Sequence, residues 1–174
     1  MSRWNSRGLR GSALEEMINM TNQLYWQHGL AVIQKVPTPI TPVEVSNKER
    51  IITKAFFGEK STVDYIGVVQ GIPICFDAKE TQSKNLPINN IHQHQLAFME
   101  AFSQQEGVAF LLVHFKTEGQ IFFLPIEEIR KHYDTAQNGG RKSIPHSAFE
   151  SKYLVRNEEG FPVHYLKAIN TYLV

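Results

Sequence analysis

Residues 61–81 read STVDYIGVVQGIPICFDAKET, and they decide the fold class. Two runs rich in apolar and β-branched residues, 63–69 and 72–78, flank the pair Gln70-Gly71. Such runs are typical of β-strands, and a short glycine-containing link between them is typical of a tight hairpin. The stretch therefore predicts two neighbouring strands of one sheet.

Three ionisable side chains fall at the ends of these two strands. Side chains two apart on a strand share a face, so Asp77 and Lys79 should project the same way, and the hairpin should bring Asp64 beside them. Two nearby carboxylates repel each other, which favours binding a hard divalent cation such as Mg²⁺. Lys79 would then stabilise charge on a phosphate or position an attacking water. The plain alternative is a solvated sheet edge, because D-x-K alone occurs in very many proteins.

Apolar periodicity predicts the remaining elements of the chain. Ser12 and Glu15 match a capping box that opens a first helix, and Gly29 is a plausible end for it. Further strands are expected at 31–36, 108–115 and 120–124, further helices at about 91–102, 126–133 and 163–173, and a glycine-rich loop at 134–143. This order indicates an α/β fold, with a central mixed sheet and helices on its faces.

Residues 37–60 differ from the rest of the chain. Pro37, Pro39 and Pro42 open the segment, and proline cannot donate to the ladder of a central strand. A run rich in β-branched and basic residues follows. We therefore expect a single domain over residues 1–174, with 37–60 as a projecting arm.

Composition sets limits on the class of protein. The chain has 174 residues, 42% of them hydrophobic, and a formal net charge of +1. No apolar run reaches the length of a membrane span, and the first ten residues lack the apolar core of a signal peptide. Cys75 is the only cysteine, which excludes an internal disulfide and a cysteine-based zinc site. A soluble, cytoplasmic protein is expected.

Basic residues gather in three places, and each could be an ordinary solvated loop. If the fold brings them onto one face, they would suit the phosphates of nucleic acid. The candidate DNA-binding residues are Arg7, Arg10, Lys48, Arg50, Lys54, Lys60, Arg141 and Lys142.

Several motifs along the chain share one resemblance. In order they are Arg7-Gly8, LEEMIN at 14–19, KVPTP at 35–39, STVDYIG at 61–67, FDAKET at 76–81, HQHQ at 92–95 and GRKSI at 140–144. Together they resemble the RecU family of Holliday junction resolvases, within the PD-(D/E)xK nucleases. The resemblance runs from about Asn5 to the end of the chain.

The resemblance implies a restriction-endonuclease-like fold, a homodimer, and a stalk that enters the centre of a four-way DNA junction. The stalk coincides with the arm at 37–60. Mg²⁺ is the implied cofactor, with Mn²⁺ as its substitute, and Lys79 matches the family's transition-state-stabilising lysine. Glu15 or Glu16 would border the site, although Glu15 could serve only in the capping box. The positions that match the family's metal-binding residues are Thr62, Asp64, Asp77 and Gln95.

One departure stands out, because RecU proteins usually have glutamate where this chain has Asp77. Aspartate is one methylene shorter, so a metal must approach the strand more closely or bind through a water. Activity is expected to survive, with altered metal preference as an alternative.

Other functional interpretations stay open at this stage. They are a restriction-type duplex nuclease, against which the arm argues, and a non-catalytic junction-binding or regulatory protein, which the Asp77 change favours. His92 and His94 suggest zinc only weakly, because no cysteine cluster accompanies them, and they would equally suit phosphate contacts. Partners among recombination proteins leave no legible signal.

Overall fold

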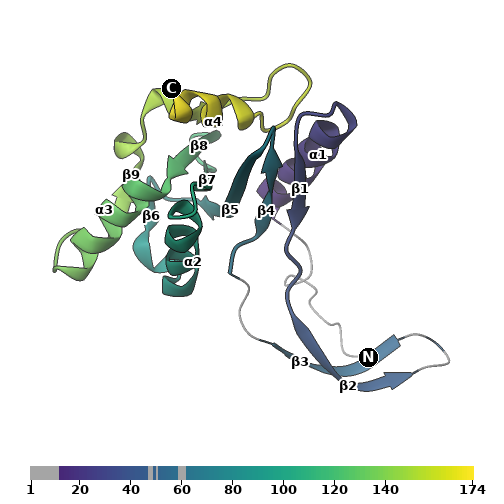
Figure 1. Ribbon diagram of the computed structural model, residues 1–174. Helices are drawn as coiled ribbons and strands as arrows, with labels where there is room; N and C mark the ends of the chain where they lie inside the picture. The colour runs from purple at the N-terminus through teal and green to yellow at the C-terminus, as the bar shows by residue number, and fades with distance from the viewer. Residues whose placement is uncertain (1–11, 47–48, 50, 59–61) are drawn as a thin grey trace.

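The computed structural model describes residues 12–46, 49, 51–58 and 62–174. At the centre of the protein lies a six-stranded sheet in the order β1-β4-β5-β7-β8-β10 (Figure 1). Neighbouring strands run antiparallel except β5 and β7, which are parallel. The strands are β1 (Val32–Lys35), β4 (Tyr65–Val69), β5 (Ile72–Thr81), β7 (Val108–Phe115), β8 (Gln120–Pro125) and β10 (Leu154–Val155). The predicted α/β class with a central mixed sheet is therefore confirmed.

The predicted hairpin joins β4 to β5 through Gln70 and Gly71. Both residues have positive φ, 48° and 89°, as a two-residue type I′ turn requires. Pairing with β4 ends at Phe76, yet β5 continues to Thr81, because β7 pairs with it on the other side. The prediction ended this strand at Ala78, three residues too early, since the partner strand that prolongs it is distant in sequence.

Helices cover both faces of the sheet. One core lies under α1 (Ala13–Gln27) and α4 (Leu166–Leu173), and the other under α2 (Gln93–Ser103) and α3 (Ile126–Gln137). Ile74 and Phe76 of β5 belong to the first core, and Cys75 belongs to the second. Because side chains alternate along a strand, Asp77 follows Cys75 onto the face that α2 covers.

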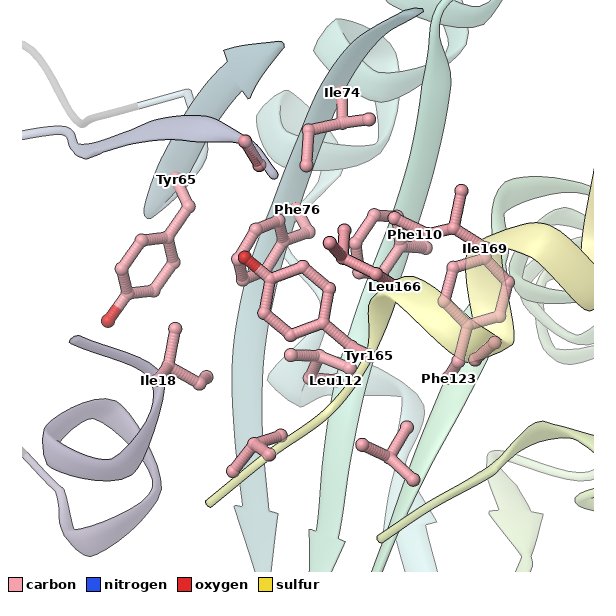
Figure 2. Close-up of a cluster of buried hydrophobic side chains, with 14 of the residues drawn as sticks. Ile18, Tyr65, Ile74, Phe76, Phe110, Leu112, Phe123, Tyr165, Leu166 and Ile169 are labelled. Carbon is pink, nitrogen blue, oxygen red and sulfur yellow. The ribbon is translucent and has the colours of Figure 1, made fainter. Parts of the chain in front are cut away.

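An aromatic row fills the first core. The ring of Phe76 stacks on Tyr65 and on Phe110, with centroid separations of 4.7 and 4.8 Å. Figure 2 shows Tyr165 lying across this row, with its ring centroid 5.1 Å from that of Phe76. Packed aromatic rings contribute beyond their buried area, so this layer fixes β4 and β5 firmly beneath α1.

The first helix is capped partly as predicted. The Ser12 hydroxyl accepts a hydrogen bond from Glu15 N at 3.2 Å, and Leu30 N donates to Tyr25 O at 2.9 Å past Gly29, whose φ is 66°. The reciprocal half of the capping box was predicted wrongly. The Glu15 carboxylate instead pairs with a lysine of β1, as described below.

Other boundaries also differ from the prediction, two of them by three residues or more. α3 runs to Gln137, so the expected loop at 134–143 is shorter, and β9 (Ser143–Pro145) closes it by pairing with β6 (Asn85–Pro87). α4 begins at Leu166 rather than Val163, because the Val163 N–H is tied to the Thr21 hydroxyl of α1 at 3.1 Å. The 3₁₀ turns are η2 (Ile88–Asn90), η3 (His146–Ala148) and η4 (Ser151–Tyr153).

The segment interpreted as an arm contains a hairpin of its own. β2 (Ile40–Ser46) and β3 (Ile51–Phe57) form an antiparallel pair separate from the central sheet. Figure 1 shows this pair extending away from the body of the protein. Nearly all of its described side chains are exposed.

Within the part of the chain that the structure describes, every helix is too short or too polar to cross a membrane.

Candidate active site

The β4–β5 hairpin brings the two predicted carboxylates together. Asp64 stands just before β4, where its Oδ2 accepts a hydrogen bond from Ala78 N at 3.2 Å. The Asp64 N–H in turn donates to Asp77 Oδ1 at 3.2 Å. The Asp64 carbonyl accepts from Val36 N at 2.8 Å, so the end of β1 also holds this residue. Both carboxylates are thus fixed by backbone groups on neighbouring strands.

Lys79 lies on the same face of β5 as Asp77, as predicted. Its Nζ is 2.5 Å from Asp77 Oδ2, and the Asp77 side chain is fully buried while that of Lys79 is 14% exposed. Asp77 Oδ2 has no hydrogen-bond partner of good geometry among the described residues, so the ammonium charge is its main compensation. A buried carboxylate needs such a partner, because an unpaired buried charge is very costly.

Gln95 enters the site from α2 and contacts both Asp77 and Lys79. Its Nε2 donates to Asp77 Oδ1 at 2.8 Å, and its Oε1 accepts from Lys79 Nζ at 3.1 Å. The same oxygen accepts from His92 N at 3.4 Å, at the start of the helix. On sequence spacing alone Gln95 was an unremarkable helix residue, and only the family resemblance singled it out.

Burial and a neighbouring like charge raise the pKa of Asp64. Partial burial raises the pKa of this carboxyl to about 6, and repulsion from Asp77 adds to the rise. The hydrogen bond from Ala78 N and the charge of Lys79 act in the opposite direction but do not cancel it. The pair of carboxylates therefore carries more negative charge than its surroundings compensate.

These residues fit a hard divalent cation. The described residues contain no group of three or more His, Cys, Asp or Glu side chains that could hold a metal, so a cation here would take two carboxylates from the protein. Mg²⁺ commonly binds through one or two carboxylates, with waters and substrate phosphates completing its octahedron. The buried Asp77 Oδ2, with no well-formed hydrogen bond, and the raised pKa of Asp64 both agree with such a site.

The first helix contributes Glu15 to the border of the site. Glu15 Oε2 pairs with Lys35 Nζ at 2.5 Å, and burial together with the charges of Glu15, Asp64 and Asp77 raises the pKa of Tyr65. Glu15 and the two site carboxylates therefore all act on the hydroxyl group of Tyr65. Glu16 is exposed on α1.

A residue that sequence analysis did not assign holds this helix in place. Glu80 Oε1 accepts from Leu14 N at 3.1 Å, at the start of α1, and its Oε2 pairs with Lys116 Nζ at 2.7 Å. These contacts hold the pKa of Glu80 below its usual value despite some burial. A helix N-terminus favours a carboxylate, but no sequence signal shows which distant acid supplies it.

The other predicted residues that the structure describes are exposed at the surface. Thr62 and Lys142 are exposed, and Lys54 is exposed on β3 of the arm. Arg141 Nη2 donates to Asn85 Oδ1 at 2.7 Å, so this guanidinium holds β6. Arg7, Arg10, Lys48, Arg50 and Lys60 lie outside the described residues.

His92 and His94, the candidates for zinc or phosphate contacts, precede Gln95 in the chain. The imidazole rings of His92 and His94 are stacked, with centroids 5.5 Å apart and planes 10° from parallel. His92 is exposed and His94 is half-buried, at the N-terminal end of α2.

A mixed sheet that carries two carboxylates and a lysine at one strand pair defines an α/β protein with a site suited to metal-assisted phosphoryl chemistry. The family model described as "RecU: Recombination protein U" matches residues 9–171. The chain therefore belongs to the RecU family, as the motifs predicted.

Relatives of known name agree with this assignment. The Holliday junction resolvase RecU of Pediococcus pentosaceus is 41% identical over 168 residues, which cover 94% of this chain and 84% of that protein. The Holliday junction resolvase RecU of Oenococcus oeni is 41% identical over 167 residues, covering 93% and 85%. Among solved structures, Archaeoglobus fulgidus Hjc, a Holliday junction resolvase, has a TM-score of 0.47 and 9% identity, over 78% of this chain and 90% of that one.

Proposed function

We propose that this protein is a metal-dependent endonuclease that resolves four-way (Holliday) DNA junctions by symmetric hydrolysis of phosphodiester bonds. The observation that supports this most directly is the site at the β4–β5 hairpin, where Asp64, Asp77 and Lys79 meet. Relatives that share about 40% of its sequence over most of its length bear the name of that activity. We place this action in the cytoplasm, and recombination proteins are further candidate partners.

Asp64 and Asp77 would hold Mg²⁺, with Mn²⁺ as its substitute, and Thr62 and Gln95 are further candidate ligands from the family match. When bound, the cation polarises a phosphoryl oxygen and lowers the pKa of a water. The buried Asp77 side chain keeps its carboxylate in one orientation, because both of its oxygens have fixed neighbours. The backbone N–H of Ala78 holds Asp64 in the same way.

Lys79 would stabilise the negative charge that develops on the phosphate. Its ammonium is held beside the carboxylates and is largely shielded from water. Positive charge acts more strongly in such a shielded setting and needs little reorganisation when the reaction occurs.

The projecting hairpin suits a dimer that binds branched DNA. Phe56 and Phe57 are adjacent on β3 and therefore point to opposite faces, yet they are 63% and 84% exposed. Apolar side chains uncovered on both faces favour association with a partner. We propose a homodimer whose two-fold axis sets two identical sites on strands of like polarity. Basic residues of the arm, such as Lys54, would contact phosphates without reading bases.

The test is cleavage of a labelled mobile four-way junction beside a matched linear duplex, with Mg²⁺, with Mn²⁺ and with chelator. Symmetric nicking of the junction alone, dependent on metal, is the expected result. Cleavage of the duplex at a similar rate would instead indicate a restriction-type nuclease. Tight junction binding without cleavage under either metal would indicate a non-catalytic junction-binding protein, the reading that Asp77 in place of glutamate favours.

A further inference from the structure

A pocket lies between η2, the last turns of α3 and the loop that leads to β9, and we call it the η2–α3 pocket. Its volume is about 550 Å³, within the range of about 300–1,000 Å³ that is typical of small-ligand sites. Its lining is partly apolar and partly polar. The lining residues that matter here are Ile88, Ile91, Tyr133, Asn89, Gln137 and Lys142.

Contacts within the protein hold the η2–α3 pocket in shape. Ile88 N donates to Lys142 O at 3.1 Å, which joins η2 to the loop. Gly140 N donates to Thr135 O at 2.8 Å, which joins the same loop to α3. Ile88 and Ile91 are 5% and 2% exposed, so the apolar floor belongs to the core of the protein. The pocket is therefore already formed before a ligand binds.

The polar side chains of the pocket are free to bind a ligand. Asn89, Gln137 and Lys142 are exposed, and none of their side chains makes a hydrogen bond or ion pair with another described residue. A carboxamide offers both a donor and an acceptor, and an ammonium group offers only donors. Among the described residues, no acidic side chain lines the pocket, which favours an anionic ligand over a cation.

These groups together match the parts of a nucleotide. A flat aromatic base packs well on an apolar floor and beside an aromatic ring such as that of Tyr133. Asn and Gln side chains pair with the donors and acceptors on the edges of bases. The ammonium of Lys142 suits the phosphate that a base carries with it. The chemistry of the pocket therefore points to a nucleobase as its ligand.

The η2–α3 pocket adjoins the candidate active site. Ile91 directly precedes His92, whose N–H donates to Gln95 Oε1, and Gln95 donates to Asp77. Figure 1 shows α3 beside α2, the helix that carries Gln95. Ile91 and Gln95 are separated by about 6 Å along a helix axis, whereas successive nucleotides of one strand rise by about 3.4 Å. A strand with a phosphate at Asp77 would therefore bring a base to the pocket within a few nucleotides.

For the reaction proposed above, on which this inference rests, we propose that the η2–α3 pocket binds an unpaired nucleobase of the strand that is cut. In a linear duplex a base must leave its stack to enter a pocket, which costs free energy, and this cost is smallest for a base that is already unpaired. A branch point that the protein holds open supplies such bases. The pocket therefore favours branched DNA, and Asn89 and Gln137 make cleavage depend on the identity of the base.

Methyl NMR of the DNA-free protein tests the pocket without cleavage. The whole chain, labelled at its isoleucine methyl groups, is titrated with each of the four deoxynucleoside monophosphates and with deoxyribose 5-phosphate, which has no base. We expect the Ile88 and Ile91 signals to shift with at least one nucleotide at millimolar concentration and not with the sugar phosphate. Ile169, in the other core, should not shift. Equal shifts with the sugar phosphate, or no shift with any nucleotide, would overturn the inference.

Single-turnover cleavage tests whether the base belongs to the cut strand. The substrates are junctions that differ in one base near the cut, and junctions with an abasic residue at each of these positions. We expect wild-type rates to vary with the base by about tenfold or more, and Asn89→Ala or Gln137→Ala to reduce this variation to within about threefold. Both residues are exposed, so the fold should tolerate the change. Asn90→Ala, at an exposed neighbour outside the pocket lining, is the matched control and should keep the variation.

An abasic residue and Gln137→Ala would remove the same contact, so their effects on the rate should not multiply. Effects that multiply, or an unchanged base preference in both variants, would contradict the inference. If nucleotides shift the NMR signals but no abasic position slows cleavage, the ligand is a free nucleotide and the inference is wrong. A wild-type protein that cleaves no junction would refute the proposed function, whereas the NMR titration would still decide whether the pocket binds a nucleobase.

Discussion

At the scale of single residues, the site is defined by negative charge that the protein only partly compensates. Asp64 and Asp77 are joined through the Asp64 N–H, and among the described residues Lys79 supplies the only ammonium group that contacts the buried Asp77. A pair of carboxylates held in this way lowers the stability of the metal-free protein and raises its affinity for a cation. Stability and function are therefore opposed at these positions.

Asp64→Asn tests this opposition. The folded-state pKa of Asp64, about 6, lies above its ordinary value of 3.8, so its ionised form destabilises the fold above pH 6. Protonation relieves this cost as the pH falls from about 7 towards 4. We expect Asp64→Asn to stabilise the metal-free protein at pH 7.5 by about 1–2 kcal/mol, after allowance for partial exposure, and to abolish cleavage. Urea unfolding of both proteins in chelator at pH 7.5 and pH 4.5 measures this gain in the free energy of unfolding. A gain of equal size at both pH values would show that the ionised form of Asp64 is not its cause.

Lys79→Met should have the opposite effect on stability. Removal of the ammonium leaves the fully buried Asp77 without its compensating charge. We expect a loss of about 2–4 kcal/mol in chelator, and a larger stabilisation by Mg²⁺ in the variant than in the wild type. Thermal unfolding with and without Mg²⁺ measures both. Equal stabilisation of the two proteins by Mg²⁺ would show that Lys79 and the cation do not share the carboxylate.

At the scale of elements, the hairpin depends on close approach of β1 to β4. A Cβ at Gly67 would lie 2.3 Å from Val32 O and 2.7 Å from Ile33 Cα. Any side chain at this position would push β1 away from β4. β1 runs directly into Val36, whose N–H holds the Asp64 carbonyl, so the site would be disturbed as well.

We therefore expect Gly67→Ala to lower the free energy of unfolding by about 2–3 kcal/mol, and to reduce cleavage further than its loss of stability explains. Gly71→Ala is the matched control. Gly71 has open space around it and φ of 89°, so only backbone strain of about 1 kcal/mol is expected. Urea unfolding of the two variants compares them, and equal losses would contradict the steric explanation.

The same scale shows what sequence can predict. The β4–β5 hairpin and the ends of α1 follow from local signals at Gln70-Gly71, Ser12 and Gly29, and all were predicted. The contacts of Glu80 with Leu14 and of Gln95 with Asp77 join residues far apart in the chain. Local periodicity carries no information about such pairs. For the same reason the end of β5 was missed, and Glu15 was paired with the wrong partner.

At the scale of the whole molecule, the arm is the part with the fewest packing contacts to account for its structure. Its strands form no part of the central sheet, and their apolar side chains are exposed. The motif at 35–39 and the family resemblance predicted a stalk. The molecule that covers it, a second copy of the chain, is a proposal. We expect association with another molecule to cover these side chains.

We expect Phe57→Ser to weaken self-association without lowering the melting temperature of the body by more than a few degrees, because Phe57 is 84% exposed. Sedimentation velocity over a range of protein concentrations measures the association. Lower junction cleavage should accompany it, as paired nicks need two sites. An unchanged dimer would place the interface elsewhere on the molecule.

The central claim is that the Asp64, Asp77 and Lys79 cluster cuts junction DNA, and single-turnover cleavage of a labelled four-way junction tests it most directly. Wild type and Lys79→Ala are compared at saturating Mg²⁺, with Lys152→Ala, an exposed lysine paired with Glu150, as the control. We predict a loss of at least about a hundredfold in Lys79→Ala, with junction binding retained, and no change in Lys152→Ala. Cleavage by Lys79→Ala at the wild-type rate would contradict the account.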